Sequence, residues 1–124
     1  MNRTIYIYNV DQGENGGLLN SFGCSATIDK IAWSPDGKFM VILYDGNRRP
    51  EIFNIENKVL VKKIENGRYE THDMDLSLDG KFLATSSYSG LYITNFKNNE
   101  TFEMDNYREV YSVSISPNSK LLAF

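Results

Sequence analysis

Apolar and polar residues alternate along most of the chain with a period of two residues. In segments 28–33, 72–77 and 111–116, apolar side chains occupy alternate positions, which is typical of a half-buried β-strand. The segments that start at Lys38 and Lys81 are apolar or small on both faces, which predicts interior strands covered on two sides. Segment 56–66 contains good helix formers, but its apolar residues make no helical stripe, so we interpret it as an outer strand. An all-β chain is predicted.

Two sets of short motifs repeat with one common period. The first set is SPDGKFMV, SLDGKFLA and SPNSKLLA, which begin at residues 34, 77 and 116 and are therefore 43 and 39 residues apart. The second set is IYNV, IFNI and ITNF, which begin at residues 7, 52 and 93. The dipeptides Asp36-Gly37 and Asp79-Gly80 predict tight turns between paired strands, and Asn118-Ser119 is a weaker version of them. Each unit of about 42 residues is predicted to contain four short strands.

The strands of each unit start in the middle of the expected sheet. Counted from the N-terminus, they occur in the order third, fourth, first and second, which divides the chain into units of about 1–44, 45–87 and 88–124. Because each unit begins with a third strand, we expect a sheet to contain strands from two successive units.

A four-stranded unit of this length resembles the blade of a WD-repeat β-propeller. The similarity is best over residues 23–55, GCSATIDKIAWSPDGKFMVILYDGNRRPEIFNI, where the family has a Gly-His pair, an apolar-x-Trp-Ser-Pro-Asp-Gly strand and turn, and a closing Trp-Asp. Gly23 stands at the family's glycine and Cys24 where histidine is usual. The pairs at 8–9, 53–54 and 94–95 are Tyr-Asn, Phe-Asn and Thr-Asn in place of Trp-Asp. Because these hydrogen-bonding residues are replaced, we expect the blades to be held together mainly by apolar packing.

Within the expected blade core, Trp33 alternates with Ile31 and precedes a turn. We therefore expect the indole ring to be packed, with Asp36, Gly37, Asp79 and Gly80 in structural roles in the turns. Propellers close with about four to eight blades, and three sets of strands are too few. We expect further blades in a longer propeller, or self-association of this chain, to complete the ring.

Composition and charge narrow the classes of function. The chain has 124 residues, of which 41% are hydrophobic and 23% are charged, as in an ordinary globular domain. The net charge of −3 is spread along the chain and gives no basic field for a nucleic-acid partner. The longest apolar run, 39–44, is far too short to span a membrane, and the first residues do not resemble a secretory signal. A cytoplasmic location is expected.

No catalytic, cofactor-binding or metal-binding set is predicted. The single histidine, His72, has no cysteine or second histidine near it in sequence, and the single cysteine, Cys24, is interpreted as a small buried side chain. Segment 73–80, DMDLSLDG, has its glycine at the wrong position for a calcium loop and is interpreted as a strand that enters a turn. The glycine-rich segment 13–17 lacks the lysine of a phosphate-binding loop and predicts a hairpin connection.

Arg48 and Arg49 are the candidates for a partner-binding loop, because paired arginines can bind phosphate or carboxylate groups in a bidentate manner. We expect a non-enzymatic scaffold for protein–protein interaction. The alternative is the propeller of a larger regulatory factor. Residues 74–96 are loosely similar to a blade of the guanine nucleotide exchange factor of vesicle trafficking, and residues 33–54 to the propeller of translation initiation factors.

Overall fold

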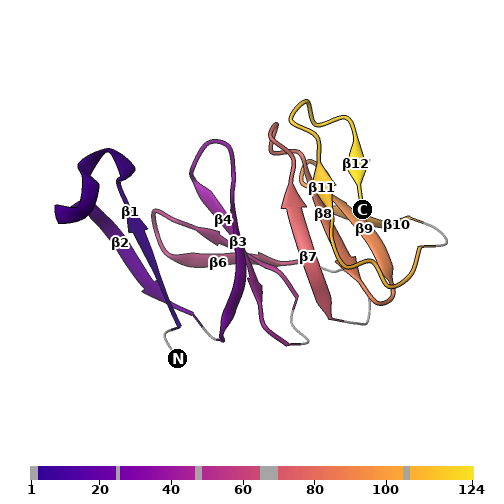
Figure 1. Cartoon of the computed structure of the whole chain (residues 1–124), viewed down its shortest axis with the longest axis horizontal. Helices are drawn as coiled ribbons and strands as arrows, with labels where there is room; N and C mark the ends of the chain where they lie inside the picture. The colour runs from indigo at the N-terminus through magenta and orange to yellow at the C-terminus, as the bar shows by residue number, and fades with distance from the viewer. Residues whose placement is uncertain (1–2, 25, 47–48, 65–69, 105–106) are drawn as a thin grey trace.

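The chain folds into stacked antiparallel β-sheets. The computed structural model describes residues 3–24, 26–46, 49–64, 70–104 and 107–124. These residues contain twelve strands, one short 3-10 helix and no α-helix, so the all-β prediction is confirmed. The strands form four sheets that follow one another along the long axis of the molecule, from β1 and β2 to β11 and β12 (Figure 1).

Two of the sheets have four strands in sequential order. One comprises β3 (Ile28–Trp33), β4 (Phe39–Tyr44), β5 (Glu51–Asn54) and β6 (Val59–Lys63). The other comprises β7 (Thr71–Leu76), β8 (Phe82–Ser87), β9 (Gly90–Asn95) and β10 (Glu100–Met104). Strand β6 confirms the outer strand predicted for 56–66. Each of these sheets takes its first two strands from one sequence unit and its last two from the next.

The remaining strands form two pairs at the ends of the stack. Strand β1 (Thr4–Tyr8) pairs with β2 (Leu18–Gly23), and β11 (Ser114–Ile115) pairs with β12 (Leu122–Ala123). The connection from β1 to β2 confirms the hairpin predicted around 13–17, but it also contains the 3-10 helix η1 (Val10–Asn15), which the sequence pattern did not indicate.

Strand β4 is buried on both faces, as its continuous apolar sequence predicts. Met40, Ile42 and Tyr44 pack with Ile5 of β1 on one side. The intervening residues Val41 and Leu43 pack against the β7–β10 sheet on the other side. The period of two therefore directs one strand into two separate cores.

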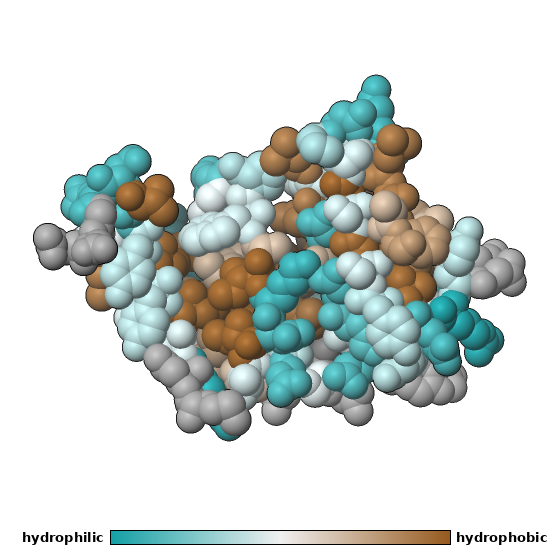
Figure 2. Space-filling model, viewed as in Figure 1, coloured by the Kyte–Doolittle hydropathy of each residue, from teal (hydrophilic) through white to brown (hydrophobic). Residues whose placement is uncertain are grey.

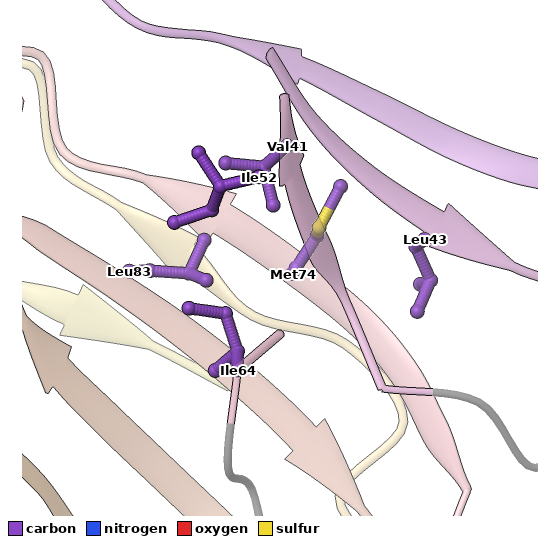
Figure 3. Packing of buried hydrophobic residues seen from close by; sticks show 6 residues of the cluster. All are labelled: Val41, Leu43, Ile52, Ile64, Met74 and Leu83. Carbon is purple, nitrogen blue, oxygen red and sulfur yellow. The ribbon is translucent and has the colours of Figure 1, made fainter. Parts of the chain in front are cut away.

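Three hydrophobic layers hold the four sheets together. The central layer lies between the two four-stranded sheets, where the side chains of both sheets point toward one another (Figure 3). Its buried members are Val41, Leu43, Ile52, Ile64, Met74 and Leu83. A second layer joins the β1–β2 pair to β4, and a third joins the β7–β10 sheet to the β11–β12 pair.

The prediction that Trp33 is packed in a core is wrong for this chain, because 46% of the residue is exposed. Trp33 pairs with Met40 and Ile31 pairs with Ile42, so both face the side of the sheet on which β1 lies. The corresponding residues of the next repeat, Met74 and Leu76, face the β3–β6 sheet and pack into the central layer. Trp33 has no such cover because the β1–β2 pair lacks strands that correspond to β3 and β4.

Among the described residues, no helix has the length and apolar character needed to cross a membrane.

Candidate interaction surface

The serine motifs form the same turn three times. Ser34 donates its hydroxyl to Asp36 Oδ1 at 2.6 Å, and its Oγ accepts the N–H of Phe39 at 2.9 Å. The same two bonds, with the same lengths, recur from Ser77 and from Ser116. The third residue after each serine has positive φ: Gly37 at 71°, Gly80 at 73° and Ser119 at 59°. The structural role predicted for the Asp-Gly dipeptides therefore has a direct physical basis.

The second set of motifs also marks turns. Asn54 Oδ1 accepts the N–H of Glu56 at 3.0 Å, and Asn95 Oδ1 accepts that of Lys97 at 2.8 Å. Asn9 Oδ1 accepts the N–H of Asp11 at 3.0 Å at the start of η1. Asparagine thus caps the chain as it leaves β1, β5 and β9.

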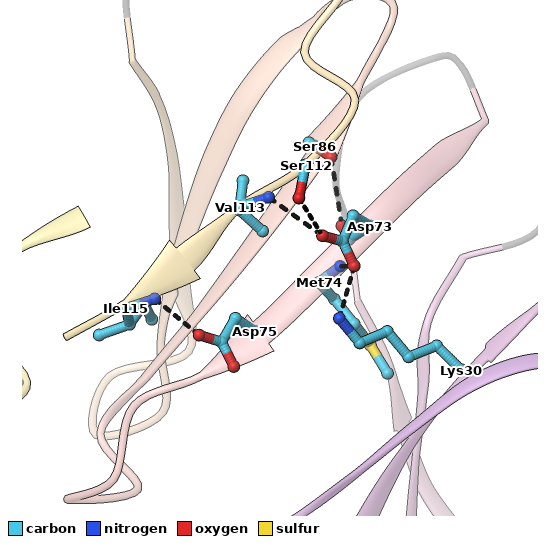
Figure 4. Close-up of polar contacts among 8 residues, drawn as sticks. All are labelled: Lys30, Asp73, Met74, Asp75, Ser86, Ser112, Val113 and Ile115. Carbon is cyan, nitrogen blue, oxygen red and sulfur yellow. Dashed lines mark hydrogen bonds and ion pairs between the residues drawn. The ribbon is translucent and has the colours of Figure 1, made fainter. Parts of the chain in front are cut away.

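The first strands of successive sheets lie side by side, β3 beside β7 and β7 beside β11. Polar contacts between them centre on Asp73 (Figure 4). Lys30 Nζ lies 2.6 Å from Asp73 Oδ1, while Asp73 Oδ2 accepts the hydroxyl of Ser112 and the N–H of Val113, both at 3.0 Å. Asp75 Oδ2 accepts the N–H of Ile115 at 2.6 Å. Partial burial favours a higher pKa for Asp73, but the bonds from Lys30, Val113, Met74 and Ser112 outweigh it, so its pKa is lowered.

The connections define two opposite ends of the sheets. The serine turns and the β5–β6 and β9–β10 turns lie at one end, which we call the turn end. The β4–β5 and β8–β9 connections and the starts of β3 and β7 lie at the other, which we call the loop end.

An aromatic cluster lies at the loop end. The rings of His72 and Tyr111 are stacked, with centroids 4.9 Å apart and planes 4° apart. The ring of Tyr88 meets His72 edge-on at 4.3 Å. Tyr88 is 49% exposed and Tyr111 is 60% exposed, so the cluster presents aromatic surface to solvent. Exposed aromatic residues are frequent at the centres of protein interfaces.

The segment before Tyr111 is fixed against the β8–β9 turn. The N–H of Glu109 donates to the carbonyl oxygen of Tyr88, and that of Val110 to the carbonyl oxygen of Ser87, both at 3.2 Å. The carbonyl oxygen of Val110 lies 3.1 Å from His72 Nδ1. These backbone bonds anchor the cluster to the sheet.

Partial desolvation, with smaller effects of Tyr88 and the Glu109 charge, raises the pKa of Tyr111.

The arginine loop lies at the same end. Arg49 is exposed between β4 and β5, and Arg48 lies outside the described residues.

The two residues with metal-binding or nucleophilic potential have structural surroundings. His72 is half-buried within the aromatic cluster, and no group of three or more potential metal ligands occurs among the described residues. Cys24 is half-buried beside the core that contains Tyr44, and burial raises the pKa of its thiol. The thiol is therefore kept protonated near neutral pH, which makes it a poor nucleophile.

A hollow of about 440 Å³ opens between the two four-stranded sheets at the turn end. Its floor contains the buried Val41 and Ile52, and its walls contain the half-buried Phe39, Leu76 and Phe96. Its rim carries Asp36 and Asp79 from two successive serine turns, with Val61, Lys62 and Asn99 also lining it. The structure thus brings both predicted turn aspartates to one hollow.

Sequence reasoning missed the aromatic cluster and this hollow. Counting back five residues from the repeated serines aligns Asp29, His72 and Tyr111, a comparison that indicates a shared surface at the starts of the first strands. No local motif marks the hollow, because its lining residues come from several strands and turns of two sheets.

No protein-family model matches the sequence, and no curated protein shows significant similarity to it.

Proposed function

We propose that this chain is a segment of a WD-repeat-type β-propeller and acts as a non-enzymatic scaffold that binds other proteins. The observation that carries the proposal is the relation between successive sheets. The four-stranded sheets have the same strand order, cover one another face to face, and place their first strands side by side. Blades around a propeller axis have this relation.

The proposed ring needs further strands beside β1. In the two complete sheets, Met40 pairs with Phe53 and Leu83 pairs with Thr94. The equivalent residues in the end pairs are Leu122 of β12 and Tyr8 of β1, so a β11–β12 hairpin from a second copy would place Leu122 opposite Tyr8. Further blades of a longer protein would supply an equivalent hairpin. Either source would also cover Ile31 and Trp33, which are 38% and 46% exposed.

The aromatic cluster at the loop end is the proposed partner surface. It combines exposed rings with a backbone that hydrogen bonds hold in place, so little ordering entropy is lost on binding. Arg49 at the same end extends this surface with a positive charge.

Affinity capture with quantitative mass spectrometry tests the scaffold role. The chain is used as bait beside Tyr88→Ala/Tyr111→Ala and the matched control Phe102→Ala, whose ring is 54% exposed on the outer strand β10. We expect a reproducible set of proteins that Phe102→Ala retains and the double tyrosine variant loses. A set unaffected by the tyrosines would contradict the role of the aromatic cluster, and the lack of any reproducible partner would contradict the scaffold role.

A further inference from the structure

The hollow between the two complete sheets is lined by apolar surface that the chain's own side chains leave unfilled. Its volume of about 440 Å³ falls within the range of about 300–1,000 Å³ that is typical of ligand pockets. Protein interiors are otherwise close-packed, so a space of this size beside Phe39, Leu76 and Phe96 can accept a bulky apolar group. Figure 2 shows that hydrophobic residues also gather on the surface in the middle of the molecule, near β3 and β6.

The rim of the hollow is acidic on the side of the serine turns. The bond from the Ser34 hydroxyl, followed by that from the Lys38 N–H, lowers the pKa of Asp36. Equivalent bonds from Ser77 and Lys81 lower the pKa of Asp79, so both carboxylates are ionised at neutral pH. Lys38 and Lys81 lie close enough to contribute to this effect, but among the described residues neither aspartate is in an ion pair.

Lys62 is engaged elsewhere on the rim. Its Nζ donates to Asn99 Oδ1 at 3.2 Å and so links strand β6 to the β9–β10 turn. This contact leaves the two aspartates available to a cation from outside the chain.

The next repeat provides an internal comparison. A hollow of about 210 Å³ is lined by Phe82, Ile93 and Ile115, which correspond to Phe39, Ile52 and Leu76. Its rim has Ser119 and Lys120, and no carboxylate lines it among the described residues. The stacking of sheets therefore generates the hollow, whereas the larger volume and the acidic pair are specific to the first one.

We propose that the hollow between the β3–β6 and β7–β10 sheets binds a partner peptide that inserts a bulky apolar side chain and places an adjacent arginine or lysine against Asp36 and Asp79. The apolar group gains by leaving water, and the cation gains by meeting two carboxylates at the rim. The inference rests on the proposed scaffold function and names a partner chemistry for a second surface of it.

The chain itself shows how to remove the charge without removing the turn. Asn118 occupies the aspartate position of the third serine turn and accepts the same two hydrogen bonds, from Ser116 Oγ at 2.6 Å and from the Lys120 N–H at 3.1 Å. Asp36→Asn and Asp79→Asn are therefore expected to preserve the turns. Val61→Trp fills the hollow from its rim, and Val59→Trp is its matched control, since Val59 is exposed on the same strand but does not line the hollow.

Titration of the ¹⁵N-labelled chain with N-acetyl-phenylalanyl-arginine amide, followed by NMR to millimolar concentrations, tests the proposal. We expect saturable shifts at the amides of Gly80 and Asn99, and about fivefold weaker binding for the Asp36→Asn/Asp79→Asn variant and for the glutamate analogue of the peptide. Val61→Trp should abolish binding and Val59→Trp should not. No saturable shift at the hollow, or equal binding by the asparagine variant, would overturn the proposal.

The two proposals fail separately. Suppose that the double tyrosine variant loses the captured proteins but the peptide causes no saturable shift at the hollow. The inference about the hollow is then wrong and the scaffold function stands. If no partner is captured, the scaffold function fails whatever the peptide does.

Discussion

Lys30 Nζ lies 2.6 Å from Asp73 Oδ1, and the two residues occupy the same position of successive repeats, four residues before the repeated serine. Ser112 occupies that position in the third repeat and donates its hydroxyl to Asp73 Oδ2. One position in three repeats therefore carries a cation, an anion and a hydroxyl that hydrogen-bond in a row across the first strands. The contacts between repeats depend on these differences as much as on the shared motif.

Removal of the Asp73 carboxylate should loosen the contacts between first strands. Asp73→Ala leaves the Val113 N–H and Lys30 without their acceptor, so we expect a loss of about 1–3 kcal/mol in the free energy of unfolding. Denaturant unfolding at neutral pH measures this loss. Lys30→Met, which removes only the exposed partner, is the control and should cost less.

The pH dependence of stability should also change. The folded-state pKa of Asp73 is lowered, so its contribution is present above the unfolded pKa of about 3.9 and is lost as the pH falls through the folded value. Below about pH 4, the unfolding free energy of the parent chain should fall more steeply than that of Asp73→Asn. Asp36 and Asp79 are present in both proteins, so they contribute equally to the pH dependence of the two unfolding free energies. Equal slopes would contradict this role of Asp73.

The three serine turns allow a comparison at one backbone position. Gly37, Gly80 and Ser119 all have positive φ, which costs a residue with a side chain about 1–2 kcal/mol. Ser119→Gly removes this backbone cost but also removes the hydroxyl that accepts the Asp79 N–H at 3.1 Å, so the two effects should nearly cancel and the net change should stay below about 1 kcal/mol. Gly80→Ala should cost more than Gly37→Ala, because its Cβ would meet Pro35 Cδ at 3.2 Å whereas the space beside Gly37 is open. Thermal unfolding of the three variants measures these changes in stability. A larger loss for Gly37→Ala than for Gly80→Ala would be inconsistent with the turn geometry.

Two apolar residues of the first strands should differ in how much they contribute to the free energy of unfolding. Met74→Ala removes a fully buried side chain from the central layer and should cost about 2–5 kcal/mol. Leu76, the equivalent of Trp33, is half-buried, whereas Trp33 is 46% exposed, so Trp33→Ala should cost only about 1–2 kcal/mol in dilute solution. Urea unfolding at low protein concentration provides both values. A larger loss for Trp33→Ala than for Met74→Ala would show that the ring is covered.

Self-association should be visible through the same tryptophan. In the proposed ring, the β1–β2 pair and the β11–β12 pair of two copies would combine into one four-stranded sheet, and the second copy would cover Trp33. Light scattering coupled to size exclusion should show a discrete dimer, and the emission of the single tryptophan should shift to the blue as concentration rises. Aggregates would instead indicate that further blades are needed. A sharp 14 kDa monomer with cooperative unfolding would contradict both possibilities.

The sequence specified most of the fold because its signals are local. Alternation defines the strands, and the serine and asparagine motifs define the turns, so β3 to β10 follow from the pattern alone. The burial of individual side chains could not be predicted from local patterns in the same way. Trp33 has the alternation of a core residue, but its exposure depends on the strands of a neighbouring sheet, which no local pattern reports. The aromatic cluster and the hollow join several elements and likewise required the structure.

The most direct test of the propeller arrangement is the spacing of three equivalent residues. Lys38, Lys81 and Lys120 are exposed at the same position of successive serine turns, so each can be replaced by a spin-labelled cysteine in a Cys24→Ala background. Pulsed electron–electron double resonance of the three spin-labelled pairs should give equal distances for 38–81 and 81–120. In a ring of about four to eight blades, the 38–120 distance should be roughly 1.4 to 1.85 times either of them. A ratio of about two would indicate a straight stack of sheets, and unequal single steps would contradict the repeat itself.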